Sequence, residues 1–255
     1  MTIAHIQFHE PLQELLRSRN RAQLQRIEFK GSQTIKHLVE SLGVPHTEVG
    51  QLQVMDNTIG FGYLVKSGDI VHVNVATADH DHLSGMFDDG RMTIPARFIL
   101  DNHLGKLASD MRMLGFDAYY SNAYQDQGLV ESAISEGRIL LTRDRQLLMR
   151  KTIRYGYLLR SLQPDEQLLE ILERFNLFSD INLFQRCMRC NHLLEPIEKK
   201  EIEHRLEPLT NKYFFEFHIC TGCQQIYWSG SHVERMEKHL EEILPLEIFA
   251  NLKFR

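Results

Sequence analysis

The sequence predicts an α/β domain with a mostly parallel sheet, preceded by a smaller α+β domain and followed by a cysteine-bearing ribbon. Three observations predict this organisation. Strands alternate with helices over residues 96–175, which is the pattern of βαβ units. Two strands, a helix and two further strands follow one another in residues 1–77. Residues 176–255 hold all four cysteines of the chain, as two Cys-x-x-Cys pairs.

The composition is ordinary for a soluble globular chain. Of the 255 residues, 43% are hydrophobic and 25% are charged, and the formal net charge is −5. This net charge excludes a uniformly basic nucleic-acid binder, but it is compatible with a local basic patch. No apolar run approaches the roughly 20 residues that a membrane-spanning helix needs. The N-terminus lacks the pattern of a secretory signal, so we expect a cytoplasmic protein that makes no membrane contact.

Residues 1–77 have the element order of a β-grasp domain, the fold of ubiquitin. Thr34 is a predicted helix N-cap, and apolar residues then recur at helical spacing as far as Gly43. Alternating or continuous apolar residues predict four strands around this helix. The strands are expected at Ile3–Phe8, Ile27–Lys30, Gln51–Met55 and Ile70–Val75.

Residues 78–95 are predicted to form a linker, because they are polar, contain glycine and show no steady period. The run Asp79-His-Asp-His82 within them consists of metal-ligating side chains. Nothing near this run fixes a coordination geometry. A solvated linker is therefore the preferred interpretation, with a metal-binding run as the alternative.

Residues 96–175 alternate between buried-type strands and amphipathic helices. The strands are predicted at Arg97–Leu100, Ala118–Tyr120 and Arg138–Leu141. The helices are predicted at 104–114, 129–134, 146–151 and 165–175, and glycines end the first two of them. Beyond this module, His232–Leu244 is predicted to be an amphipathic helix.

Acidic residues follow two of these strands. Asp101 directly follows one, and Asp144 lies just beyond the strand that ends at Leu141. Functional groups collect beyond the carboxyl ends of strands in open α/β sheets, so the two carboxylates are expected at one edge. Asp126 precedes the helix between these strands and is expected to join them. Asp117 is a weaker fourth candidate.

Such an acidic edge suits a divalent metal ion. Mg²⁺ and Mn²⁺ prefer carboxylate and water oxygens, and such ions promote hydrolysis of phosphodiesters. The alternative is that Asp101 and Asp144 are helix N-caps, and their spacing in the sequence leaves both interpretations open.

Basic residues are concentrated beside Asp144. Residues 138–160 hold seven lysines and arginines against this one acid, with two tyrosines among them. A basic, aromatic strip next to carboxylates fits a phosphate backbone directed towards a metal site. Arg143 and Arg145 are the predicted phosphate contacts, and Lys106 is a further candidate. A solvated helix face is the alternative interpretation.

The cysteine pairs Cys187-x-x-Cys190 and Cys220-x-x-Cys223 predict a zinc site, because four thiolates satisfy tetrahedral Zn²⁺. Disulfides or a redox pair are the alternatives. The 29-residue spacer is longer than usual and is expected to contain a hairpin. A closed site with four cysteines is structural, so the zinc is assigned no catalytic role. Nearby histidines, His192 among them, could replace a cysteine. The only tryptophan, Trp228, is expected to pack in the ribbon core rather than to stack on a base.

Several of these segments together resemble the Mut-seven C-terminal RNase family, a branch of the PIN-like nucleases. Asp101-x-x-Leu-Gly-Lys-Leu-Ala108, Met111-Arg-Met-Leu-Gly-Phe-Asp117 and Glu136-Gly-Arg-Ile-Leu-Leu-Thr-Arg-Asp144 carry the resemblance in the α/β module. The cysteine pairs with the segment Tyr227–His232 are similar to the zinc ribbon of that family. Residues 1–77, with Gly43–Val49, resemble the ubiquitin-like domain often fused in front of it.

The resemblance implies a PIN-like, metal-dependent ribonuclease fold. Asp101 and Asp144 match the acidic positions of the family at strand ends, and Asp126 matches the acid before the second helix. Asp110 departs from the pattern, because an apolar or aromatic residue is expected there. The N-terminal domain lacks a terminal Gly-Gly, so we do not expect it to act as a sulfur carrier or a conjugated modifier.

The sequence therefore favours an endoribonuclease in which Asp101, Asp126 and Asp144 hold Mg²⁺ or Mn²⁺ and the ion activates water. Two other hypotheses stay open. The protein could be a non-catalytic RNA- or ribosome-associated binding module, whose acids are caps. It could also be an adaptor that binds a protein partner through its β-grasp surface.

Overall fold

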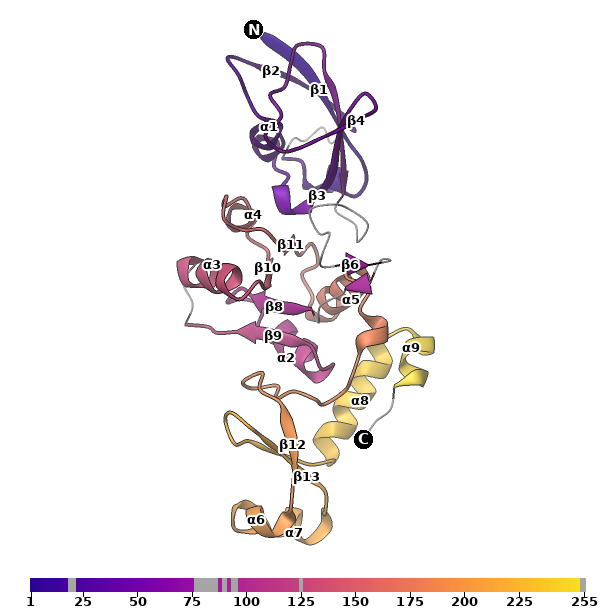
Figure 1. Cartoon of the computed structure of the whole chain (residues 1–255). Coiled ribbons are helices and arrows are strands. Elements are labelled where there is room, and N and C mark those ends of the chain that lie inside the picture. Colours follow the sequence, from indigo (N-terminus) through magenta and orange to yellow (C-terminus); the bar gives the residue numbers. More distant parts are fainter. Residues whose placement is uncertain (18–21, 76–86, 89–90, 93–95, 124–125, 253–255) are drawn as a thin grey trace. The chain divides into compact units, whose positions relative to one another are not determined.

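The structure is a computed structural model, and it describes residues 1–17, 22–75, 87–88, 91–92, 96–123 and 126–252 (Figure 1). The chain divides into two compact units. The first consists of Met1–Asp101 and Tyr124–Arg160, and the second of Asn102–Ala123 and Ser161–Arg255. The β-grasp elements thus share a unit with part of the α/β module.

The N-terminal sheet of the first unit has five strands in the order β2-β1-β5-β3-β4. Strands β1 and β5 pair in parallel and their other neighbours pair antiparallel, which is the β-grasp arrangement that the sequence predicts. Thr34 caps the helix α1, accepting the His37 N–H at 3.3 Å. The bounds are β1 (Thr2–Phe8), β2 (Leu24–Phe29), α1 (Ile35–Ser41), β3 (Val49–Val54), β4 (Asn57–Ile59) and β5 (Ile70–Val75), with 3₁₀ turns η1 (Leu12–Leu15) and η2 (His46–Glu48).

The core of this sheet follows its alternating pattern. Ala4, Ile6 and Phe8 of β1 are fully buried, and Leu38 and Val39 of α1 are buried as well. The sequence did not predict strand β4. Its three residues are exposed or half-buried, so they do not form an apolar pattern that would indicate a strand.

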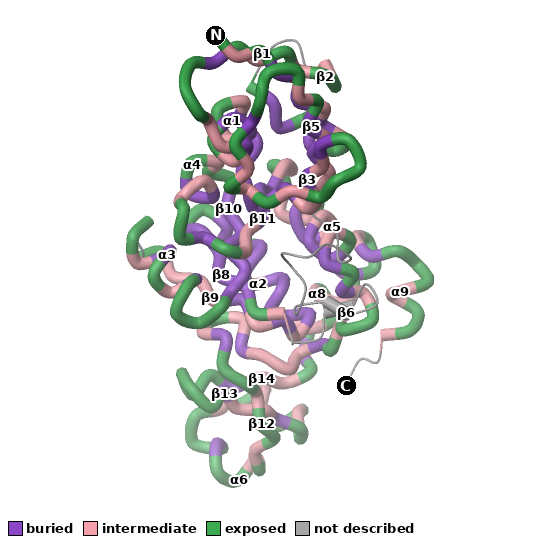
Figure 2. The backbone as a smooth tube through the Cα atoms, turned by 45° about the horizontal axis from the view of Figure 1, so that its top comes forward, coloured by how far each residue is buried: buried purple, intermediate pink, exposed green. Residues whose placement is uncertain are grey.

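The first unit also contains parallel strands of the α/β module. Strand β10 (Ile139–Thr142) pairs in parallel with β8 (Arg97–Leu100) on one side and with β11 (Gly156–Leu158) on the other. The apolar residues of β8 and β10 are almost fully buried, as expected for a parallel sheet (Figure 2). Two helices accompany these strands, α3 (Asp126–Ser135) and α4 (Arg145–Leu148). Strand β11 is an unpredicted element, short and glycine-containing.

The second unit holds the rest of the α/β module and the cysteine segment. The α/β elements are α2 (Gly105–Met113), β9 (Asp117–Tyr120), α5 (Pro164–Arg174) and the 3₁₀ turn η3 (Phe178–Asp180). Strands β12 (Leu194–Ile197), β13 (Phe217–Cys220) and β14 (Ile226–Tyr227) form an antiparallel sheet in that order. Strands β12 and β13 confirm the predicted hairpin, and their connection carries α6 (Lys199–Ile202), η4 (Glu203–Arg205) and α7 (Pro208–Tyr213). The chain continues through α8 (Ser231–Ile243) and α9 (Leu246–Asn251).

Most of the predicted linker, including Asp79–His82, lies outside the described residues. Its described parts are β6 (Phe87–Asp88) and β7 (Arg91–Met92), which pair antiparallel. Within the described ranges, none of the helices combines the length and the apolar character that crossing a membrane requires.

Candidate functional site

A single hydroxyl links two of the predicted acidic residues. Asp101 directly follows β8, and Thr142 ends the neighbouring parallel strand β10. Thr142 Oγ1 donates to Asp101 Oδ2 at 2.5 Å, and it accepts the Asp144 N–H at 2.9 Å. Asp101 is only 8% exposed and Thr142 is fully buried. The parallel pairing of β8 and β10 therefore brings both acidic residues to one edge of the sheet.

The alternative role of helix capping applies to Asp144 and not to Asp101. Asp144 is the N-cap of α4, where its Oδ1 accepts the Gln146 N–H at 2.8 Å. Its Oδ2 accepts no hydrogen bond from a described residue. The N-cap of α2 is Leu104, three residues beyond Asp101. Asp144 therefore has a structural partner and an oxygen left for a second interaction.

Asp126 is an exposed member of the three predicted acids. It begins α3, and its side chain is 61% exposed. Its Oδ2 pairs with Arg150 Nη2 at 3.3 Å. In the part of the chain that the structure describes, Asp101, Asp126 and Asp144 do not form a group whose carboxylate oxygens all lie within 4.8 Å. Asp101 and Asp144 thus share an edge of the sheet, and the three acids do not meet at one point.

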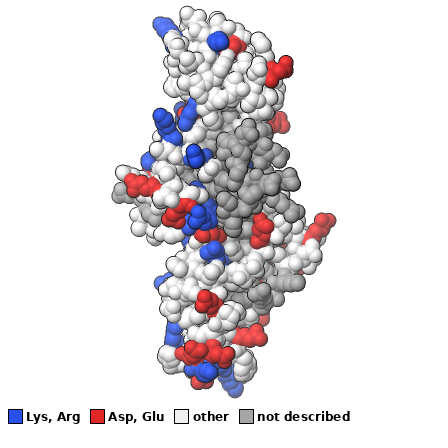
Figure 3. Space-filling model, viewed as in Figure 1, with Lys and Arg blue, Asp and Glu red and all other residues white. Residues whose placement is uncertain are grey.

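Arginines line a cleft beside the capped end of α4. Arg143 is exposed and Arg145 is half-buried, and both contribute to a hollow of about 440 Å³ together with Arg160. Glu14 is the acid among its lining residues. Figure 3 shows basic side chains grouped near α4 and β10 on this face. The guanidinium groups can attract an anion such as a phosphodiester.

Lys106, the third predicted phosphate contact, lies on α2 in the second unit. Its Nζ contacts Asp110 Oδ1, one turn along the helix. Asp110 is 4% exposed although the family pattern predicts an apolar residue there. Burial raises the pKa of Asp110, and Lys106 opposes that rise.

The four cysteines come together at one point. The Sγ atoms of Cys187, Cys190, Cys220 and Cys223 all lie within 4.8 Å of one another. The Cys187–Cys223 separation is 3.6 Å and the Cys190–Cys220 separation is 3.2 Å. A disulfide needs about 2.05 Å, and all four cysteines are free. Tetrahedral zinc with bonds of about 2.3 Å places its sulfurs roughly 3.8 Å apart, so the cluster suits this ion.

Tyr227 supports this cluster from β14. Its hydroxyl lies 3.1 Å from Cys187 Sγ. Burial raises the pKa of Cys187, but hydrogen bonds from Tyr227 and from backbone N–H groups outweigh burial and lower it to about 7. Burial and the neighbouring thiols raise the pKa of Tyr227. A tyrosine that stays protonated can donate to a thiolate and so stabilise a metal-binding form of the cluster.

Comparison with protein families decides the relationship. Residues 96–240 match the family described as the Mut7-C RNAse domain, and residues 1–80 match the family described as Mut7-C ubiquitin. The chain belongs to the Mut7-C RNase family. The comparisons with curated proteins and with solved structures gave no match. The Mut7-C domain extends from β8 into α8, and the ubiquitin domain covers β1 to β5, which confirms the resemblance seen in the sequence.

The ubiquitin domain contacts the Mut7-C domain through a buried glutamate that sequence reasoning missed. Glu48 of η2 is fully buried. Its Oε1 accepts the Leu158 N–H of β11 at 2.7 Å, and its Oε2 pairs with Arg160 Nη2 at 3.2 Å. His46 joins this contact, since its Nε2 lies 2.9 Å from the Ile153 carbonyl oxygen. In the sequence, the position of Glu48 inside the motif Gly43–Val49 could have indicated that this glutamate matters.

Gly43 in the same motif allows a close approach. Its φ of +107° lies in the left-handed region that glycine favours. A Cβ atom there would lie 2.8 Å from Arg145 Nη1 and 2.6 Å from Arg17 Cγ. The glycine therefore lets the ubiquitin domain pass close to an arginine of the cleft.

Asp117, the weaker fourth acid, anchors the first cysteine pair of the Mut7-C domain. Its Oδ1 accepts a hydrogen bond from Asn191 Nδ2 at 2.7 Å. In turn, Asn191 Oδ1 accepts a hydrogen bond from the Ala118 N–H at 3.1 Å. Arg112, which is 4% exposed, donates to the carbonyl oxygens of Met188 and Ala118 at 3.0 and 2.7 Å. These contacts give Asp117 a structural role.

Trp228 packs in the ribbon core, as its sequence context predicts. Its ring lies 6.4 Å from those of Phe214 and Phe217, between centroids. It covers a small cluster of buried residues that includes Ile202 and Ile226.

Proposed function

We propose that this Mut7-C protein is a metal-dependent endoribonuclease that hydrolyses RNA phosphodiester bonds at the edge formed by Asp101 and Asp144. The observation that carries the proposal is the Thr142 hydroxyl, which connects both acids at the carboxyl ends of adjacent parallel strands. Membership of an RNase family supplies the reaction class.

The donor set fits Mg²⁺ or Mn²⁺. Mg²⁺ keeps several waters and needs only one or two carboxylates from the protein, and Asp101 with the unbonded Oδ2 of Asp144 supplies two. Asp126 completes the set when its exposed pair with Arg150 opens. When bound, the ion would activate water and neutralise developing charge on the phosphate.

The chain's own residues perform the other tasks. The Thr142 hydroxyl orients the carboxylate of Asp101 by donating to its Oδ2. Arg143 and Arg145 attract and hold the phosphate backbone in the cleft beside α4. The helix cap of Asp144 fixes the orientation of its carboxylate.

The four thiols are assigned to a structural zinc ion. Their mutual distances and the Tyr227 hydroxyl suit a closed tetrahedral site. Four protein ligands leave no open position for a substrate, so this ion would support the fold only.

The test is RNA cleavage by the purified protein with Mn²⁺, Mg²⁺ or EDTA, compared with Asp101→Asn and Asp144→Asn. Each asparagine keeps the hydrogen-bonding oxygen and removes the charge, so we expect cleavage to fall at least about a hundredfold while the fold persists. Asp56→Asn, an exposed substitution in the β3–β4 turn, is the matched control and should cleave normally.

Unchanged cleavage by both acid variants would disprove the proposed site. Metal-indifferent RNA binding without cleavage, retained in Asp144→Asn, would instead support the non-catalytic binding module. Isothermal titration of Mn²⁺ separates the two cases, because only the catalytic site predicts weaker binding of the ion to the variants.

A further inference from the structure

A cavity between the cysteine-bearing sheet and α8 is unused by the proposed nuclease site. It has a volume of about 380 Å³, within the range of small-molecule sites. A second hollow of about 500 Å³ adjoins it. The two share five lining residues, namely Met188, Tyr227, Trp228, Val233 and Met236.

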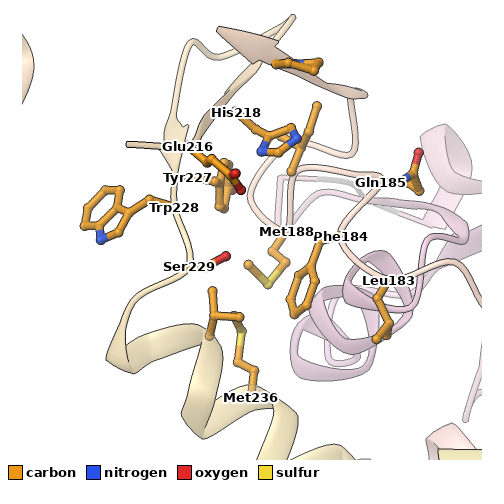
Figure 4. Close-up of a pocket in the computed structure, with 13 residues that line it drawn as sticks. Leu183, Phe184, Gln185, Met188, Glu216, His218, Tyr227, Trp228, Ser229 and Met236 are labelled. Atoms are coloured by element: carbon orange, nitrogen blue, oxygen red, sulfur yellow. The ribbon is translucent and has the colours of Figure 1, made fainter. Parts of the chain in front are cut away.

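The walls of the first cavity suit a flat apolar ring. Phe184, Met188 and Met236 surround one space in Figure 4. Thioethers are polarisable and adapt to aromatic faces, and a phenylalanine ring offers a stacking surface. A planar heterocycle could therefore lie between these side chains.

Phe184 is held in place by the backbone. Its φ is +57°, which is unusual for an aromatic residue. Its N–H donates to the Met113 carbonyl oxygen at 2.9 Å, and the Asn182 N–H donates to the Leu114 oxygen at 2.9 Å. Gly115 permits this approach, because a Cβ there would lie 2.2 Å from Asn182 O. The end of α2 thus fixes the position of the aromatic wall.

The carboxylate of the cavity favours a ligand that donates hydrogen bonds. His218 lies on β13 and Glu216 directly precedes this strand, and the two lie together at one end of the cavity in Figure 4. None of the described residues that line this cavity is a lysine or an arginine. A carboxylate without a cation disfavours a phosphate and favours the amino group of a base.

The adjoining hollow supplies the missing cation. Arg189, which is exposed, lines it together with His232. A nucleotide whose base enters the first cavity could therefore place its phosphate in the second.

We propose that this cavity binds one base of single-stranded RNA and prefers bases with an exocyclic amino group. Adenine, cytosine and guanine can each donate such an amine to Glu216, whereas uracil cannot. Single-stranded RNA is commonly recognised by aromatic stacking combined with hydrogen bonds to base edges. This inference rests on the proposed function for its choice of RNA, and it gives the ribbon region a role in substrate selection.

The experiment measures fluorescence anisotropy of short, labelled homopolymers of A, C and U with the zinc-loaded full chain. We expect the A and C oligomers to bind about tenfold more tightly than U. Glu216→Gln should remove most of that difference. Glu195→Gln, an exposed acid on β12 that does not line the cavity, is the matched control and should leave it unchanged.

Phe184→Gly tests the stacking wall. Glycine adopts the positive φ without strain, so the ring is lost while the backbone stays favourable. We expect all oligomers to bind roughly tenfold more weakly. Equal binding of all three homopolymers, or an unaltered preference in Glu216→Gln, would overturn the proposal.

Asp144→Asn separates this inference from the nuclease. The variant should keep the base preference although its cleavage is lost, because Asp144 does not line the cavity. A wild-type chain that cleaves RNA but binds every base alike would disprove only the base site. Selective binding without cleavage would disprove only the nuclease.

Discussion

The thiols and the carboxylates of this protein are arranged in opposite ways. The four cysteines lie within 4.8 Å of one another, and each has another thiol as its neighbour. Each important carboxylate instead has its own partner from the protein. The pairs are Asp101 with Thr142, Asp144 with Gln146 N–H, Asp126 with Arg150, Glu48 with Leu158 N–H and Arg160, and Asp110 with Lys106.

This difference teaches what each set needs in order to be stable. Four gathered thiolates repel one another unless a cation binds, so their site depends on a metal. A carboxylate with its own donor is stable without one. We therefore expect metal removal to unfold the ribbon and to leave the acidic edge intact.

The largest effect is expected from Cys220→Ser. The proposed zinc ion should not bind to this variant, because a tetrahedral site with three thiolates is incomplete. Structural zinc contributes about 10–16 kcal/mol in small zinc domains. The sheet β12-β13-β14 should then become sensitive to proteases. Zinc analysis by mass spectrometry and limited proteolysis measure both effects.

His192→Ala is the control for this substitution. His192 lies beside the cluster, with its Nδ1 3.2 Å from the Cys190 carbonyl oxygen, but it is outside the four-thiol group. The variant should keep one zinc per chain. Full zinc content in Cys220→Ser would contradict the four-thiol site.

Glu48→Ala should have the next largest effect. It removes the acceptor of the buried Leu158 N–H and one acceptor of the Arg160 guanidinium, which we expect to cost about 3 kcal/mol of unfolding free energy. Urea denaturation of the full chain measures this loss. Glu14→Ala should change stability by less than about 0.5 kcal/mol, because Glu14 is 64% exposed and 4.0 Å from the same arginine. Equal losses in both variants would show that the buried contact does not join the domains.

Asp144 should contribute less to stability. Asp144→Ala removes the cap of α4 and should cost about 1 kcal/mol, whereas Asp144→Asn should cost almost nothing because asparagine caps equally well. Thermal denaturation measures both. If asparagine destabilises as much as alanine, the charge of Asp144 matters to the fold, and its effect on cleavage could not be assigned to catalysis alone.

The sequence predicted the thiol site better than the acidic edge, and the reason is physical. Two Cys-x-x-Cys turns almost determine a four-thiol cluster, because each short turn holds two ligands together. Asp101 and Asp144 depend on the pairing of strands that lie some forty residues apart in the chain. The sequence located both strands, but the hydroxyl of Thr142 between the acids follows only from the register.

Contacts between modules were the hardest to predict. Glu48 lies in a turn, and a glutamate in a turn is usually solvated. Its burial arises from β11, a strand of three residues that is too short to be recognised in the sequence. The β-grasp order and the buried strands β8 and β10 were predictable because their apolar periodicity is local. A protein partner of the ubiquitin domain stays a prediction.

Asp110 offers the smallest expected effect, since its carboxylate is buried and only partly compensated. Its Oδ2 is buried without a hydrogen bond, and burial raises its pKa. Lys106 and His239 oppose this rise, and Asp165 adds to it. When folding raises the pKa of an acid, the protonated acid contributes stability that is fully present at a pH below the ordinary pKa of the unfolded chain. This contribution is lost as pH rises through the higher pKa of the folded state.

Asp110→Asn should therefore stabilise the protein at neutral pH, because asparagine carries no buried charge and can still accept a hydrogen bond from Lys106. The gain should shrink as pH falls through the raised pKa of the folded carboxyl, and it should be smallest below the ordinary aspartate pKa of about 4. Thermal denaturation across this range, with Asp56→Asn as an exposed control, measures the difference. A variant that is less stable at neutral pH would mean that the ion pair with Lys106 outweighs the burial of the charge, and Asp110 would then resemble Glu48 more than we expect.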